Sequence, residues 1–252
     1  MDKQHSNRRN FLRNVALGSV AALSIPEIVS AAVKGEKGKK HTLKKGDIIL
    51  FQGDSITDSG RKREEGYNNA GVLGNGYPYL AAGELLWKHA DKDLKIYNKG
   101  ISGNKVFQLA ERWDAECLDI KPNVLSILVG VNDFWHTMSG NYKGTVQTYR
   151  DDFTALLDRT KQKLPEVKLI IGEPFAVKGV KAVDDKWYPA FNEYRVAARD
   201  IAAKFDAAFI PYQSVFDKAQ QVAPGVYWTF DGVHPSLAGA KLMAQAWMET
   251  IK

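Results

Sequence analysis

Several chemical features are scarce in this sequence, and each absence excludes some classes of function. The only cysteine is Cys117, so no internal disulfide can form, and we expect a buried thiol. No group of His, Cys or Asp residues has the spacing of a metal site. The apolar stretch at 15–33 is too short and too interrupted for a confident membrane span, and no cysteine near its end suggests a lipid anchor. We therefore expect no metal, no cofactor and no stable membrane anchor.

The excess of positive charge lies in the N-terminal part of the chain. Residues 1–45 carry ten Lys or Arg against three Asp or Glu, whereas residues 46–252 carry 25 against 26. The isoelectric point of the chain, near 9.2, is therefore high because of the N-terminal segment. A nucleic-acid partner would need basic charge on the folded domain, so we expect none.

The N-terminal segment has the features of an export signal. Arg8 and Arg9 precede a moderately apolar stretch with a small-residue exit at 30–32. This pattern predicts twin-arginine export to the periplasm or the cell exterior, with a signal at 1–32, a Lys-rich linker at 33–45 and one domain at 46–252. Two alternatives stay open. The apolar stretch could be an amphipathic helix of the folded domain, and the linker could be mobile or could follow the surface.

The remainder alternates short apolar runs with longer helical patterns, and it contains enough apolar residues for one sizeable core. The predicted strands are Asp47–Phe51, Leu94–Tyr97, Val124–Val129, Lys168–Gly172 and Ala208–Ile210. The predicted helices are Tyr77–His89, Val106–Glu116, Val146–Leu164, Pro189–Phe205 and Ser236–Ile251. Such alternation predicts an α/β fold, with a parallel sheet and helices on both faces.

Polar motifs follow the first three predicted strands. Ser55 follows the first strand, Gly103 the second and Asn132 the third. Ligands of open α/β sheets bind outside the carboxyl ends of the strands, so these residues are expected at one edge. Taken singly, each has an ordinary interpretation: a turn or N-cap serine, a loop glycine and an Asx-turn asparagine.

A further motif near the C-terminus completes a catalytic pattern. A serine hydroxyl needs an adjacent base to become a nucleophile, and His234 can be that base. Asp231 lies three residues earlier, across a turn, where it can orient the imidazole. His136 is the rival histidine, but a pocket or surface role suits it better. The nucleophile-elbow sequence G-x-S-x-G is absent from the chain.

These four blocks, in this order, strongly resemble the SGNH (GDSL-type) hydrolases over roughly residues 47–252. The resemblance implies a flavodoxin-like three-layer sandwich and a Ser-His-Asp mechanism that uses Ser55, His234 and Asp231. It also implies an oxyanion hole formed by the amides of Ser55 and Gly103 and the side chain of Asn132. A tetrahedral oxyanion needs such preorganised donors.

Segments 53–61, 74–78 and 98–104 look most like the acetylxylan-esterase branch of this family. The resemblance therefore implies removal of acetyl groups from plant polysaccharide or its oligomers. Alternatives are a lipase or thioesterase of the same family, a sugar-binding protein without catalysis, and a phosphate or flavin binder. The oligomeric state stays open.

Segment 66–76, rich in Gly and Asn, is predicted to be a long mobile loop. Aromatic candidates for the substrate cleft are Trp135 and Phe230 first, then Tyr67, Phe175, Trp187 and Trp228.

Overall fold

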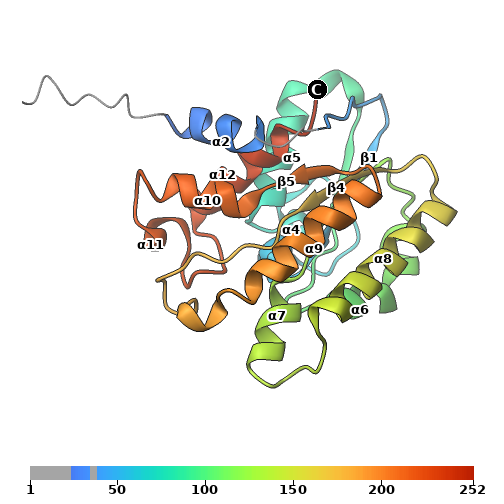
Figure 1. The fold of residues 1–252 in the computed structure, drawn as a ribbon. Coiled ribbons are helices and arrows are strands. Elements are labelled where there is room, and N and C mark those ends of the chain that lie inside the picture. The colour runs from blue at the N-terminus through green and yellow to red at the C-terminus, as the bar shows by residue number, and fades with distance from the viewer. Residues whose placement is uncertain (1–23, 35–38) are drawn as a thin grey trace, which may run out of the picture.

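The computed structural model describes residues 24–34 and 39–252, which form a parallel sheet between two layers of helices (Figure 1). The strands are paired in the order β2-β1-β3-β4-β5. Their bounds are β1 (Ile48–Gly53), β2 (Lys95–Asn98), β3 (Val124–Leu128), β4 (Lys168–Gly172) and β5 (Ala208–Ile210). This is the strand order of flavodoxin-like folds, which confirms the predicted fold class.

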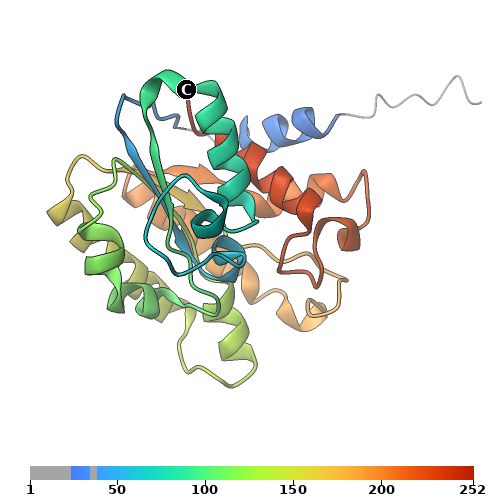
Figure 2. The same ribbon diagram turned by 180° about the vertical axis from the view of Figure 1, so that it is seen from behind.

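The central strands consist almost entirely of apolar residues because both faces of the sheet are covered. All five residues of β3 are buried, and β3 pairs in parallel with β1 on one side and β4 on the other. Helix α5 (Tyr77–Lys88) packs against α12 (Leu237–Met248) on one face. Helices α6 (Val106–Glu111), α8 (Val146–Lys163) and α9 (Phe191–Lys204) cover the opposite face, which Figure 1 shows in front, whereas the reverse view in Figure 2 brings α5 and α12 forward. Polar residues are therefore left to the strand ends.

Each predicted strand is present, with bounds shifted by at most two residues. The predicted helix at 106–116 is divided, because α6 ends at Glu111 and a π-helical turn, η2 (Asp114–Leu118), follows. Short helices that the sequence patterns did not predict occupy several loops. They are α3 (Ser55–Asp58), α4 (Ala70–Leu73), α7 (Val131–Met138), α10 (Tyr212–Ala219) and α11 (Gly225–Trp228), with 3₁₀ turns η1 (Ala90–Lys92) and η3 (Asp185–Trp187).

Segment 66–76, predicted from its composition to be a long mobile loop, includes helical structure. It contains α4, whose first turn is capped by the Asn69 side chain accepting from the Val72 amide at 3.2 Å. Val72 and Leu73 are buried, and the Leu73 carbonyl accepts from Asn98 at 2.8 Å. Packing of these two apolar side chains orders the segment despite its glycines.

The N-terminal region lies against the domain where it is described. Helix α2 (Ile25–Lys34) packs on α10 and α12, and its side chains at 28, 29, 32 and 33 are buried. Most of the predicted export signal, including Arg8 and Arg9, lies outside the described residues. Within the described parts of the chain, no helix combines the length and apolar character needed to cross a bilayer.

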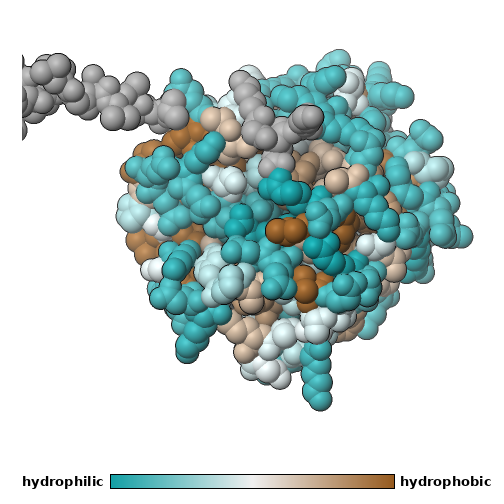
Figure 3. All heavy atoms as spheres, viewed as in Figure 1, coloured by the Kyte–Doolittle hydropathy of each residue, from teal (hydrophilic) through white to brown (hydrophobic). Residues whose placement is uncertain are grey.

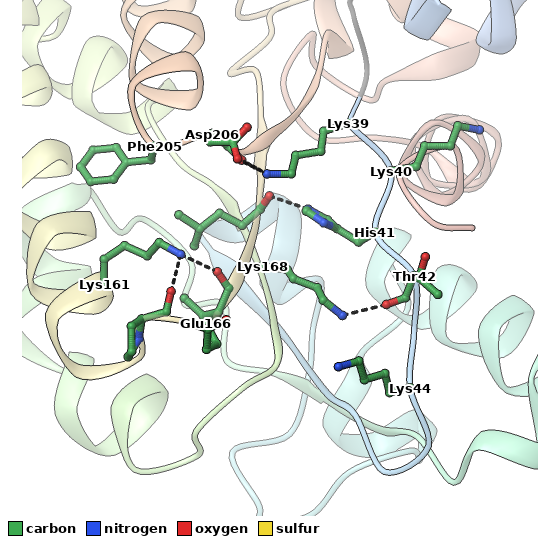
Figure 4. Close-up of a pocket in the computed structure, with 13 residues that line it drawn as sticks. Lys39, Lys40, His41, Thr42, Lys44, Lys161, Glu166, Lys168, Phe205 and Asp206 are labelled. Carbon is green, nitrogen blue, oxygen red and sulfur yellow. Dashed lines mark hydrogen bonds and ion pairs between the residues drawn. The ribbon is translucent and has the colours of Figure 1, made fainter.

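Residues 39–45 follow the surface of the domain (Figure 4). His41 pairs through its backbone with Thr250 and Lys252, and its ring lies 3.0 Å from the Leu169 carbonyl. Lys168 donates to the Thr42 carbonyl at 2.7 Å. A pocket of about 520 Å³ lies at the start of β4, at the sheet edge opposite the motif residues, and five lysines line it: Lys39, Lys40, Lys44, Lys161 and Lys168. The face viewed in Figure 3 is mostly hydrophilic, with apolar residues in small groups.

Candidate active site

Ser55 is placed by a tight turn at the carboxyl end of β1. Gly53 has φ +156°, and a Cβ there would lie 2.2 Å from the Leu128 carbonyl, so only glycine fits. Asp54 caps α3, accepting from the Ile56 amide at 3.0 Å. The helix cap is therefore Asp54 and not Ser55, which leaves the serine hydroxyl available for another partner.

That partner is His234, although 179 positions separate the two residues in the chain. Ser55 Oγ lies 2.9 Å from His234 Nε2, and His234 Nδ1 lies 2.7 Å from Asp231 Oδ2. The second oxygen of Asp231 accepts from the amides of Val233 and His234, at 2.9 and 2.8 Å. One carboxylate thus orients the imidazole and also closes the turn that carries it.

The electrostatics of Asp231 suit this position. Partial burial opposes ionisation of the carboxyl, but hydrogen bonds from His234 and from the Val233 amide outweigh it and hold the pKa of Asp231 below its ordinary value. The carboxylate is therefore charged at neutral pH. A negative charge at Nδ1 favours a proton on that nitrogen and leaves Nε2 free to accept one from Ser55.

Gly103, the expected oxyanion donor, and Gly100, three residues earlier in the same loop, differ in their surroundings. A Cβ on Gly100 would lie 2.5 Å from the Asp58 amide nitrogen, so this glycine permits close packing against α3. A Cβ on Gly103 would meet nothing within 4 Å, and its φ is +81°. The loop is held beside Ser55 by the Ile101 amide, which donates to the Gly53 carbonyl at 3.0 Å. Gly103 therefore borders open space, in the loop that Ile101 ties to the end of β1.

Asn132 points toward the same loop. It is buried at the second position of α7, whose N-cap is Gly130 without a side-chain cap bond. Its Nδ2 donates to the Asn104 carbonyl at 3.3 Å. The side chain therefore does not cap its own helix, contrary to the Asx-turn interpretation. An amide carries two N–H donors, and the described residues give the second no partner.

Two buried carboxyl groups beneath the site were missed by the sequence reasoning. Burial raises the pKa of Asp54 to about 7 and that of Asp133 to about 7. Oδ2 of each has no hydrogen-bond partner among the described residues. Each acid adjoins a motif residue, Ser55 or Asn132, and that adjacency was the available signal. The floor of the site therefore holds two acids that are protonated below neutral pH.

A pocket of about 420 Å³ opens beside Ser55 and His234. Phe230 lines it with 61% of its surface exposed, and Leu237, also unpredicted, is 74% exposed. The other lining residues are Ile56, Ser59, Asn75, Gly76, Tyr77, Pro235, Ser236 and Ala240. Trp135 is half-buried on α7, with its ring 5.4 Å from that of Trp187. The pocket combines a polar end at Ser55 with an apolar rim.

One predicted substrate contact, Phe175, is wrong in this arrangement. Phe175 is fully buried and stacks on Phe216 with ring centroids 4.4 Å apart, so it belongs to the core. Tyr67 is exposed and packs beside Tyr97, at 5.5 Å; like Trp135, it does not line the pocket at Ser55, and a substrate contact at either residue stays a prediction. Trp187 and Trp228 are buried, as Phe175 is. Tertiary packing decides which aromatic rings reach a cleft, and proximity in sequence to a motif does not.

The rival histidine lies elsewhere in the site. His136 Nδ1 is 3.1 Å from Lys105 Nζ, whereas the hydroxyl of Ser55 contacts His234.

Cys117 is buried, as predicted. Across 24–34 and 39–252, no three His, Cys, Asp or Glu side chains form a group able to hold a metal ion.

Comparisons with known proteins agree with this geometry. The profile of the GDSL-like Lipase/Acylhydrolase family matches residues 51–242. An acetylxylan esterase from Geobacillus stearothermophilus is 33% identical over 208 residues, covering 82% of this chain and 94% of the relative.

Solved structures extend the likeness to three dimensions. A putative GDSL-like lipase from Parabacteroides merdae superposes with a TM-score of 0.82 at 52% identity, covering 84% of this chain and 98% of that one. Axe2, an acetylxylan esterase from Geobacillus stearothermophilus, gives a TM-score of 0.74 at 31% identity, with 82% and 94% covered. Its catalytic mutants, also solved, replace an aspartate, a histidine or a serine with alanine. This chain therefore belongs to the GDSL-like lipase/acylhydrolase family and is a carboxylic ester hydrolase.

Proposed function

We propose that this protein is a serine esterase that removes acetyl groups from plant polysaccharide or its oligosaccharides through an acyl-enzyme. The observation that carries the proposal is the chain of contacts from Ser55 through His234 to Asp231, at 2.9 and 2.7 Å, beside an open pocket. A nucleophile, a base and an orienting acid in hydrogen-bond reach are the parts that acyl transfer needs.

In the first half of the reaction, Ser55 Oγ bonds to the ester carbonyl carbon and its proton passes to His234 Nε2. The charge of Asp231 stabilises the imidazolium that results. The tetrahedral intermediate then collapses as the bond to the sugar oxygen breaks, and His234 returns the proton to that oxygen. The sugar leaves with a free hydroxyl, and the acetyl group stays on Ser55. In the second half, His234 activates a water molecule in the same way, and acetate is released.

The oxyanion of both intermediates needs donors already in place. The Ser55 amide lies in the first turn of α3, where no intrahelical acceptor is available to it. The loop of Gly103 borders open space, and the free N–H of Asn132 supplies a side-chain donor. Where one donor of this kind is deleted, the transition state loses about 3–4 kcal/mol.

The acetyl-carbohydrate assignment draws on the pocket and on the relatives. Exposed Phe230 at the rim offers a flat apolar face of the kind that packs against a pyranose ring. The relative from Geobacillus stearothermophilus, matched both by sequence and by structure, is named an acetylxylan esterase. The second candidate is an acyl hydrolase for longer chains, and exposed Leu237 beside Phe230 favours it, because apolar surface stabilises an aliphatic chain.

The test compares acyl chain length and sugar in one set of assays. Acetate release from acetylated xylan and its oligomers should depend on Ser55. Aryl acetate should be turned over about tenfold or more faster than aryl butyrate, because the two extra methylenes of the butyryl group are poorly accommodated. An octanoyl ester hydrolysed faster than the acetyl ester would favour the longer-chain candidate. No release from any ester by folded protein would support a sugar-binding role instead.

A matched pair of tryptophan variants tests the sugar contact. Trp135→Ala should weaken polysaccharide turnover more than turnover of an aryl acetate, because only the polymer uses remote contacts. Trp87→Ala is the control, since Trp87 is 85% exposed near the far end of α5, about 15 Å from Tyr77 in the pocket. Equal effects of the two variants would count against a sugar contact at Trp135.

A further inference from the structure

Lys105 is an unusual lysine because it is only 8% exposed and has no acidic partner. No ion pair among the described residues includes it. Its Nζ contacts His136 Nδ1 at 3.1 Å and lies 5.6 and 5.4 Å from the ring centroids of Phe107 and Tyr142. A buried ammonium is normally paired with a carboxylate, so this one retains the capacity to bind an anion.

The contact with Lys105 defines the state of His136. An ammonium group can only donate, so Nδ1 of His136 must accept and the ring is neutral, with its proton on Nε2. Burial, and then the charge of Lys105, lower the pKa of His136 below its ordinary value, in agreement with a neutral ring. In the described part of the chain Nε2 has no partner, so it is a second donor beside the ammonium.

This pair lies next to the proposed oxyanion hole. Asn132 and His136 are four residues apart on α7, so their side chains share one face of the helix, about 6 Å apart along its axis. On the other side, Lys105 follows directly after Asn104, whose carbonyl accepts from Asn132. Trp135, a proposed sugar contact, precedes His136. A group held by the pair would therefore belong to the same substrate as the ester at Ser55.

The surrounding groups leave the positive charge largely uncompensated. Asp133 is the acid whose ionisation Lys105 favours, but its burial keeps that carboxyl protonated up to about pH 7. The half-buried rings of Phe107 and Tyr142 stack with centroids 5.6 Å apart, and their faces hold the ammonium without neutralising it.

We propose that Lys105 and His136 form a subsite for a carboxylate on the substrate, such as a uronic acid substituent close to the acetylated sugar. This inference rests on the proposed function, because it deepens the choice of polysaccharide. Lys105 would supply the charge and His136 Nε2 a directional hydrogen bond, a pairing suited to a carboxylate with two oxygens. Acidic acetylated oligosaccharides would then be preferred over neutral ones.

The experiment measures kcat/KM for two acetylated xylo-oligosaccharides, one neutral and one with a glucuronic acid branch. The wild-type protein should favour the acidic substrate by about tenfold, as expected for a hydrogen-bonded charge contact. Lys105→Met should bring the acidic-to-neutral ratio close to one, and Lys105→Arg should retain a preference.

Lys143→Met is the matched control, because Lys143 is an exposed lysine next to Tyr142, and it should keep the wild-type ratio. A wild-type ratio near one overturns the subsite without any need for a variant that folds. If Lys105→Met has reduced thermal stability and an unchanged acidic-to-neutral ratio of kcat/KM, the lysine only stabilises the loop, and the subsite is overturned. If neither oligosaccharide is deacetylated, the proposed function itself fails.

Discussion

Replacing Asp231 with asparagine tests the orientation of the imidazole with little change in shape. The carboxylate has two separate tasks, since Oδ1 accepts from two backbone amides and Oδ2 faces His234 Nδ1. In Asp231→Asn the side-chain oxygen can keep the two amide contacts, which preserves the turn. The NH₂ group then faces Nδ1, and two donors cannot share that contact.

The imidazole must respond by moving its proton to Nε2. That nitrogen is 2.9 Å from Ser55 Oγ and could no longer accept the serine proton. In proteases with a Ser-His-Asp triad, the same exchange lowers kcat by about 10⁴-fold. Such a loss corresponds to about 5 kcal/mol of transition-state stabilisation, at roughly 1.4 kcal/mol for each factor of ten. We expect a loss of this size here.

The assay is steady-state hydrolysis of an aryl acetate from pH 6 to pH 9, together with thermal unfolding of both proteins. Asp231→Asn should unfold close to the wild-type temperature, because the turn contacts remain. Asp231→Ala, which also removes those contacts, should be equally inactive but less stable. Activity of Asp231→Asn within about tenfold of wild type would refute the orienting role.

Three further predictions concern separate parts of the chain. Asn132→Ala should lower kcat for aryl acetate by about 10²–10³-fold with a modest change in KM; a loss of stability with full activity in the folded fraction would instead make the residue structural. Asp54→Asn should flatten the pH dependence of stability. The folded state raises this pKa from 3.8 to about 7, so the folded protein binds the proton more tightly than the unfolded chain. The wild-type free energy of unfolding should therefore fall as pH rises from about 4 to about 7, by an amount on the order of 4 kcal/mol. Urea unfolding at pH 5 and pH 8 measures this change, with exposed Asp119→Asn as the control. If the free energy of unfolding changed equally between the two pH values in wild type and in Asp54→Asn, the burial argument would be contradicted. Changing Arg8 and Arg9 together to lysine should leave uncleaved precursor in the cytoplasm, as followed by cell fractionation, and unchanged export would contradict twin-arginine transport.

The sheet could be predicted because its strands are short apolar runs bounded by polar turns. A strand covered on both faces, such as β3, has no polar side and is recognisable from composition alone. The short helices α7 and α10 were not predicted, because runs of eight residues carry little periodicity and are stabilised by what they pack against.

The candidate site was likewise predictable only in part. The contact of Asp231 with His234 spans three residues, so turn chemistry alone could predict it. Pairing of Ser55 with His234 depends on the strand order, and only the ordered motifs pointed to it. The core position of Phe175 and the burial of Asp54 are properties of three-dimensional packing, which no local pattern records.

Labelling with a fluorophosphonate tests the central claim most directly, because this reagent reacts with a serine only when the hydroxyl is activated as a nucleophile. Peptide mass spectrometry should find one phosphonyl group per chain, on Ser55, together with complete loss of esterase activity. Ser55→Ala should take up none, and His234→Ala should react far more slowly. A stoichiometric adduct on another residue, or full esterase activity in Ser55→Ala, would contradict the account.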